Sequence, residues 1–304
     1  MGYLERISAL CGILFLSCSM AQAKSLEDMF PMIELDGLTQ EQEDWLALQK
    51  GLDYQTGTIT LPGSQAVLEL GDAYYYFGPE DSKYVLEELW GNPPRDLSLG
   101  MVFPAEYLPL EWDAWGMLLN YDPIGFVSDE DAASYNYDEL LRDMQKDMLT
   151  ANKEREELGY GTVDLVGWAE PPHYDAESKK LYWARELSFD GVEDHTVNYD
   201  IRALGRKGVL VMSVIGSMDQ IDSIKAAAPD LIAMTHFTVG QRYVDFDPSL
   251  DTVAAIGIGG LIAGKVAAKA GFLAATLVFM KKGWVLLFLG FAALKNKIFK
   301  RKSS

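Results

Sequence analysis

The chain has 304 residues, of which 49% are apolar and 12% aromatic, and a formal net charge of -19. This length and composition are sufficient for a folded domain with appended segments, and they exclude a wholly disordered chain. The charge is unevenly distributed: residues 1–23 hold one acid and one base, and residues 253–304 hold nine bases and no acid. Residues 24–252 are left with 44 acids and 16 bases, a net charge of -28. Such a domain excludes nucleic acid as a partner and repels anionic lipid.

Residues 1–23 have the pattern of a secretory signal peptide. An apolar run, ISALCGILFL, is followed by SCSMAQA, in which Ala21 and Ala23 give the small-x-small pattern that signal peptidase requires. We predict cleavage after Ala23, with lipidation at Cys18 as the alternative. Both cysteines of the chain, Cys11 and Cys18, lie in this segment. The mature protein is therefore expected to have no disulfide and no cysteine ligand or nucleophile.

The first half of residues 24–252 predicts alternating helices and short strands. Thr39 and Gln42 form a capping-box pattern for a first helix, which Gly51 ends. Pro79 at a helix start and Gly91 after its end mark a second helix. In chain order, the expected elements are a helix at 40–50, a hairpin at 57–70, a strand at 73–78, a helix at 79–90, strands at 99–104 and 114–121, and the longest helix at 137–159.

The second half is richer in strand patterns. Gly205 and Gly208 stand in the tight turn before the last strand, where positive φ is expected. A helix over 217–237 is expected to be interrupted at Pro229. The four expected strands are 161–172, 179–189, 196–205 and 207–216. Strands joined by hairpins predict an α+β fold, an antiparallel sheet flanked by helices, with a C-terminal transmembrane helical anchor. One exported acidic domain, residues 24–252, is favoured; two subdomains divided near residue 160 are the alternative.

Residues 253–294 are predicted to form the membrane anchor region. Its apolar blocks, 253–264, 270–280 and 283–294, are each shorter than the roughly 20 residues of a full span. The favoured span is one tilted helix over 253–280; a span over 270–294 and a two-span hairpin are the alternatives. The basic tail, residues 295–304, is expected in the cytoplasm by the positive-inside rule.

Small and charged residues in the anchor suggest how it could pack. Gly260, Gly264 and Ala268 recur at four-residue spacing, a pattern that allows close packing with another helix and suggests a homo-oligomer formed through the anchor. Lys265 and Lys269 are predicted intramembrane charges, either at a contact with a partner helix or extended to the lipid headgroups.

Three aspartates just before the anchor are the candidate metal ligands. Asp245, Asp247 and Asp251 supply carboxylate oxygens at short spacing, as Ca²⁺ requires, but the glycine and distal glutamate of an EF-hand loop are missing. The alternative is a rigid acidic turn between the last strand and the anchor, which Pro248 also suits.

The sequence has few other motifs typical of catalytic or cofactor-binding sites, so no cofactor and no catalytic residue are predicted. The chain has three histidines without a metal-binding spacing, and no nucleophile elbow or phosphate loop. Carboxylate pairs such as Glu111/Asp113 and the run Asp129, Glu130, Asp131 are expected by chance among so many acids. One further stretch is a candidate binding loop, formed by Trp168, Glu170, Pro171, Pro172, His173 and Tyr174.

Three segments, GWAEPPHYDAESKKLYWARELSF, NYDIRALGRKGVLVM and GQRYVDFDPSLDTVAA, together resemble the bacterial family called domain of unknown function 2167, described as predicted membrane-anchored proteins. The resemblance implies a cell-envelope protein with a signal, a domain and an anchor, and it carries over no catalytic residues. We therefore expect a non-catalytic sensor, adaptor or assembly factor, anchored by its C-terminus in the inner membrane with its domain in the periplasm. Its expected partners are the membrane and an envelope or membrane protein; the alternative is an envelope hydrolase using an acidic pair or a bound metal.

Overall fold

A computed structural model describes residues 21–33, 37–63, 65–92, 94, 96–111, 113–132, 135–157, 161–191 and 193–264. The strands are β1 Gln22–Lys24, β2 Tyr54–Thr56, β3 Thr58–Thr60, β4 Ala66–Glu69, β5 Tyr74–Phe77, β6 Gly100–Pro104, β7 Gly116–Asp122, β8 Val163–Asp175, β9 Lys180–Phe189, β10 Thr196–Leu204, β11 Val209–Ser217 and β12 Thr235–Phe237. The helices are α1 Leu26–Met29, α2 Gln40–Lys50, α3 Pro79–Tyr84 with its wider continuation η1 Val85–Leu89, α4 Tyr137–Glu157, η3 Met218–Gln220, α5 Ile221–Ala233, η4 Tyr243–Asp245 and α6 Ile258–Ala263.

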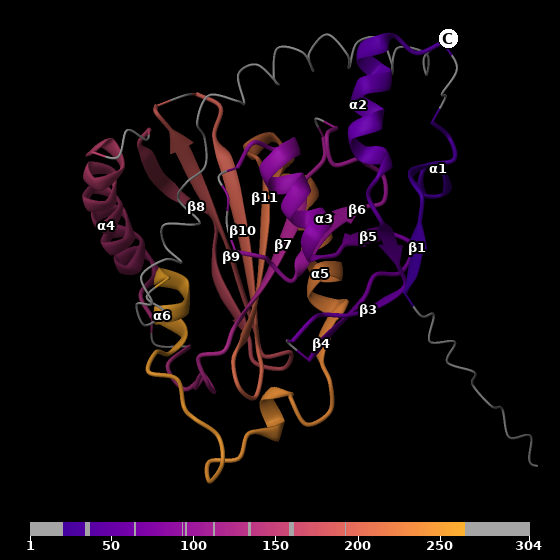
Figure 1. The fold of residues 1–304 in the computed structure, drawn as a ribbon. Coiled ribbons are helices and arrows are strands. Elements are labelled where there is room, and N and C mark those ends of the chain that lie inside the picture. The colour runs from indigo at the N-terminus through magenta and orange to yellow at the C-terminus, as the bar shows by residue number, and fades with distance from the viewer. Residues whose placement is uncertain are drawn as a thin grey trace, which may run out of the picture.

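A nine-stranded sheet crosses the described domain, in the order β1-β2-β5-β6-β7-β11-β10-β9-β8. All of its neighbouring strands are antiparallel. A second sheet has the order β12-β4-β3. Figure 1 shows α4 and α6 beside the β8 end of the large sheet and α2 and α3 toward its β1 end. The predicted α+β class, an antiparallel sheet flanked by helices, is confirmed for the described residues, and the sheet continues across the division considered near residue 160.

Apolar side chains bury both faces of the large sheet. On one face, α5 and the small sheet pack on the central strands through residues such as Ile224, Leu231 and Leu210. On the other face, α1 to α3 cover β5 and β6, while α6 and parts of α4 cover β9 and β10 around the buried Trp183. Each face of the sheet therefore has its own core.

The helix caps agree with the sequence prediction. Thr39 and Gln42 form both bonds of the capping box of α2, and Gly51 is its C-cap. The helix that starts at Pro79 continues as η1 and is followed by Gly91 at φ 67°. The predicted interruption at Pro229 is wrong, because α5 continues through it. The buried face of α5 against the central strands offsets the one backbone hydrogen bond that proline removes.

The turn between β10 and β11 differs from the prediction in its backbone. Neither Gly205 nor Gly208 has positive φ. A Cβ at Gly205 would contact the ring of Phe237, and one at Gly208 would contact the Asp122 carbonyl and the ring of Tyr121. These glycines are therefore needed for close packing rather than for a left-handed turn.

Candidate functional site

The segment that follows β12, residues 238–257, is fastened to the β10–β11 turn. Arg206 in that turn donates from its backbone to the Gln241 carbonyl and from Nη1 to the Gly240 carbonyl at 3.2 Å. Its Nε donates to Asp251 Oδ2 at 2.6 Å. The Asp251 side chain is only 2% exposed. The chain that leads to the apolar C-terminal region is thus part of the folded domain.

The three predicted metal-ligating aspartates face different partners. Asp245 forms an ion pair with Arg242 at 2.7 Å and accepts the backbone N–H of Gly240. Asp247 accepts the hydroxyl and the backbone N–H of Ser249. Asp251 binds Arg206. No group of three histidine, cysteine or acidic side chains that could hold a metal occurs among the described residues. The geometry corresponds to the alternative prediction, a rigid acidic turn.

These local partners also keep the three carboxylates ionised. The hydrogen bond from Arg242 lowers the pKa of Asp245, the Ser249 hydroxyl lowers the pKa of Asp247, and Arg206 lowers the pKa of Asp251. Each of the three carboxylates therefore already has a hydrogen-bonding side chain, from the segment itself or from the adjoining β10–β11 turn.

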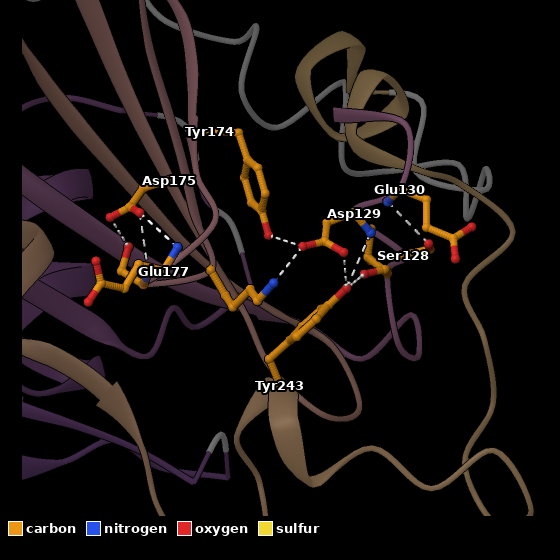
Figure 2. A network of polar contacts seen from close by, with 10 residues as sticks. Ser128, Asp129, Glu130, Tyr174, Asp175, Glu177 and Tyr243 are labelled. Atoms are coloured by element: carbon orange, nitrogen blue, oxygen red, sulfur yellow. Dashed lines mark hydrogen bonds and ion pairs between the residues drawn. The ribbon is translucent and has the colours of Figure 1, made fainter. Parts of the chain in front are cut away.

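The central group of the site is the Asp129 carboxylate, in the loop between β7 and α4 (Figure 2). Its Oδ2 accepts the Tyr174 hydroxyl at 2.5 Å and Lys179 Nζ at 2.7 Å, and its Oδ1 lies 3.0 Å from the Tyr243 hydroxyl. The Tyr243 oxygen also lies 3.0 Å from the Val127 carbonyl and accepts the Asp129 backbone N–H at 3.2 Å. The network joins the β7–α4 loop, the β8–β9 turn and η4.

The surroundings of Asp129 favour an ionised carboxylate and keep the neighbouring Tyr174 and Tyr243 hydroxyls protonated. Burial alone would raise the pKa of Asp129, but the hydrogen bonds from Lys179, Tyr174 and Tyr243 together outweigh burial and lower it. Burial and the neighbouring Asp129 charge raise the pKa of both tyrosines. Lys179 Nζ also lies 5.0 Å from the centre of the Tyr243 ring. With both oxygens occupied, Asp129 acts as a clamp between segments, not as a free acid or base.

The predicted binding loop lies within a strand. Residues 163–175 form β8, whose pairing with β9 shifts register at three places between Leu165 and His173. Pro171 and Pro172 fit here because β8 is the last strand of the sheet and is bulged, so their missing N–H groups leave no ladder bond open. The prediction that these residues form a loop is therefore wrong; the turn that connects β8 to β9 is residues 176–179.

The side chains of the predicted binding loop contact different partners and do not form one common site. The Trp168 indole donates to the Tyr137 carbonyl, whereas Glu170 bonds the Tyr199 hydroxyl. His173 packs on the Tyr182 ring at 5.0 Å. Pro172 is buried and Pro171 is exposed. Of the six candidates, only Tyr174 joins the Asp129 network.

The structure places the first predicted anchor residues on the domain. α6 spans only Ile258–Ala263 and ends at Gly264, which has φ 68°. Gly259 lies against the Tyr135 ring, and Gly260 lies against Ile256. The continuous helix expected over 253–280 is therefore wrong at its start, because the left-handed glycine cap ends it and buried isoleucines hold it to the domain.

The rest of the predicted anchor, including Lys265, Ala268 and Lys269, lies outside the described residues. The same holds for most of the predicted signal peptide and for residues 295–304. Among the residues that the structure describes, no helix is both long and apolar enough to cross a membrane.

Two further ionisable groups have unusual surroundings. Asp200 on β10 is 1% exposed and binds Arg185 at 2.6 Å, Arg202 at 3.1 Å and the Ser213 hydroxyl at 2.7 Å. Burial opposes its charge, yet the two arginines and Ser213 lower its pKa. Burial, with a smaller contribution from a neighbouring carboxylate, raises the pKa of Glu111 to about 7.

No local sequence pattern points to Arg206 or Lys179, and Asp129 stands in a run of acids that is expected by chance. The bonds of Asp129 to Lys179 and Tyr243 cross 50 and 114 residues. The only local signal was the position of both basic residues in hairpin turns, where side chains can reach neighbouring segments.

Comparison with known proteins identifies the family. Residues 53–292 match the family described as "Protein of unknown function (DUF2167)", and the chain belongs to this family. No protein with a curated description matches the sequence. Cyanobacterial PsbP (CyanoP) from Synechocystis sp. PCC 6803 is a solved structure with some likeness: 12% identity, a TM-score of 0.34, and coverage of 60% of this chain and 91% of that chain. A likeness this distant carries no argument about function.

Proposed function

We propose that this protein is anchored by its C-terminal region in the inner membrane of a bacterium and acts in the cell envelope through protein contacts, as a sensor, adaptor or assembly factor without catalytic activity. One observation carries the proposal: the segment before the apolar, basic region is clamped to the domain by Arg206–Asp251 and by the Asp129 network. A passive tether would need no such attachment. A clamped junction instead fixes the acidic domain relative to the apolar region on its C-terminal side.

The partition of charge supports the same arrangement. Residues 253–304 contain no acid and nine bases, four between the apolar blocks and five in the tail after them, whereas 44 of the 45 acids lie in the preceding domain. Basic residues beside apolar spans favour the cytoplasmic side, which leaves the domain on the opposite side. Of the spans considered, we propose the one over residues 270–294, because residues 258–264 form α6 and its C-cap and are therefore not available to the start of a span over 253–280.

The layout is tested in membranes isolated from cells that make the full chain. We expect the protein to remain in the membrane pellet after alkaline carbonate washing. Protease added from the periplasmic side should remove the domain and leave the C-terminal residues intact. Release by carbonate, or digestion of the last residues from the outside, would contradict the layout.

The contact role is tested by chemical crosslinking in intact cells, followed by mass spectrometry. We expect the domain to be crosslinked repeatedly to an envelope protein or to a second copy of the chain. A protein that stays monomeric and without partners under these conditions would count against the proposal.

Glu111 favours a second candidate, the envelope hydrolase. A carboxyl group with a pKa of about 7 beside another carboxylate is suited to donate a proton at neutral pH. Purified protein would be assayed with chromogenic glycoside, ester and phosphate substrates, together with elemental analysis for tightly bound metal. Turnover that is lost in Glu111→Gln and kept in Glu106→Gln would establish this candidate, and no turnover would remove it.

A further inference from the structure

Large apolar side chains are exposed in the segment between β12 and α6. Ten large apolar side chains are exposed in the described part of the chain, and four of them lie within residues 239–253. Their exposed fractions are 84% for Val239, 72% for Val244, 77% for Leu250 and 56% for Val253. We call residues 238–254 the junction loop. In Figure 1 it runs past η4 below the large sheet and rises to α6.

Aromatic rings support this loop from the domain side. Phe126 stacks on Phe246 with ring centres 3.8 Å apart and lies 4.4 Å from the Tyr243 ring. All three rings are partly exposed. Tyr243 is also held by Asp129, and Val253 forms a backbone bridge with Phe126. These contacts hold the backbone of the junction loop against the domain while its apolar side chains remain exposed.

Charges in the loop are balanced, unlike those in the rest of the domain. Three acids, Asp245, Asp247 and Asp251, are accompanied by Arg242 in the loop and by Arg206 and Lys207 in the adjoining turn. Arg242 and Arg206 bind two of the carboxylates directly. The loop and this turn together are thus neutral in a domain of net charge -28, so a negatively charged bilayer repels them less than it repels a surface with the domain's average charge.

The short connection between α6 and the next apolar block limits how far the junction loop can lie from the membrane. Only five residues, 265–269, separate Gly264, where α6 ends, from the apolar block that begins at Ala270. An extended chain of that length spans roughly 20 Å at most. If this block enters the bilayer, the membrane surface therefore lies within that reach of α6, to which the junction loop leads directly.

We propose that the junction loop lies against the phospholipid bilayer and inserts Val239, Val244 and Leu250 into its interfacial region. Apolar side chains with nearby aromatic rings and paired charges suit this zone, where rings and polar groups meet lipid headgroups. The inference rests on the proposed membrane attachment and adds a partner for the domain itself. The clamp around Asp129 and Arg206 then sets the orientation of the domain on the membrane.

The test uses the full-length mature chain, which has no cysteine if residues 1–23 are removed. Single variants Val244→Cys and Leu250→Cys would be labelled with an environment-sensitive fluorophore. Leu149→Cys on α4 and Met32→Cys, exposed by 63% and 90%, are matched controls remote in sequence from the loop. Each protein would be reconstituted into phosphatidylethanolamine/phosphatidylglycerol vesicles, with and without nitroxide-labelled lipid.

We expect labels at positions 244 and 250 to shift to shorter emission wavelength and to lose most of their fluorescence to the nitroxide lipid, while labels at 149 and 32 do not. Equal, weak quenching at all four positions in vesicle-bound protein would overturn the inference. Crosslinking between copies through position 244, without lipid quenching, would also overturn it in favour of a protein contact. Failure of the protein to float with vesicles would instead refute the membrane attachment, and the inference with it.

Discussion

Asp200 lies in the interior of the large sheet with two arginines and a serine as partners. Replacing it by asparagine leaves Arg185 and Arg202 without their buried counter-charge. We expect Asp200→Asn to lower the free energy of unfolding by about 3–5 kcal/mol, because breaking a buried ion pair exposes the full desolvation cost of the remaining charge. Urea unfolding measures the change.

Asp164→Asn, at an exposed position of β8, is the matched control and should change stability by less than about 0.5 kcal/mol. Equal losses in the two variants would contradict the role given to Asp200. Because the pKa of Asp200 is lowered in the folded state, its stabilisation is present at neutral pH. It is lost as the pH falls below the ordinary carboxyl pKa of 3.8.

The surroundings of Lys180 predict a second rise of stability with pH, at alkaline rather than acidic pH. Its ammonium group is buried at the end of α5, where it donates to the Thr235 carbonyl at 2.6 Å and to the Ile232 carbonyl. Burial lowers its pKa from 10.5 to about 8. Above about pH 8, the unfolded chain therefore holds more protons than the folded chain, and the free energy of unfolding should rise with pH.

We expect this rise between about pH 8 and 9.5, below the range in which tyrosines ordinarily titrate. Lys180→Met should remove the pH-dependent rise, whatever its effect on stability at pH 7. Chemical unfolding at a series of pH values compares the two proteins. A rise of equal slope in both would show that other groups cause it.

At the level of elements, local sequence patterns predicted most helices and strands, because capping residues and apolar periodicity are local signals. They failed where tertiary packing decides: α5 continues through Pro229, and β8 accommodates Pro171 and Pro172 through its bulges. The site was predicted only in part. Tyr174 was a candidate, but its partners Asp129 and Tyr243 come from distant segments that no local pattern connects.

The edge strand β1 overlaps the predicted cleavage site. Gln22 and Ala23 pair with Thr56 and Gln55, so cleavage after Ala23 would leave only Lys24 of this strand. We expect a chain that begins at Gln22 to be more stable than one that begins at Lys24 by about 1–2 kcal/mol, the net value of one or two backbone hydrogen bonds. Urea unfolding in the same detergent measures it, and equal midpoints would show that β1 contributes nothing.

The attachment of α6 depends on close contact at Gly259. A side chain there would meet the Tyr135 ring, so Gly259→Val should destabilise the docked helix by about 1–3 kcal/mol. Amide hydrogen exchange should then quicken in peptides that cover residues 258–264. Gly167→Ala, with no atom near its new Cβ, is the control and should leave this exchange unchanged.

For the whole molecule, the clamp and the main cores are separate sources of stability. Lys179 and Arg206 join surface segments, whereas the apolar clusters lie on the faces of the sheet. We expect the double variant Lys179→Gln/Arg206→Gln to keep the unfolding midpoint within a few degrees, because the segments that these ion pairs join lie outside the apolar cores and can open locally without global unfolding. Limited proteolysis should nevertheless cut within residues 238–257 sooner than in the wild type. Unchanged cutting would show that the clamp does not hold this segment.

The order of strands in the large sheet has a consequence for how the chain folds during synthesis. β7 and β11 are the neighbours that join its two halves, yet β8, β9 and β10 come between them in the sequence. The ribosome delivers the N-terminal half first, so β7 remains an unpaired edge until residue 217 has emerged. An open apolar strand of this kind can pair with other chains. We therefore expect the nascent protein to need protection from aggregation until residue 217 of its 304 residues has emerged.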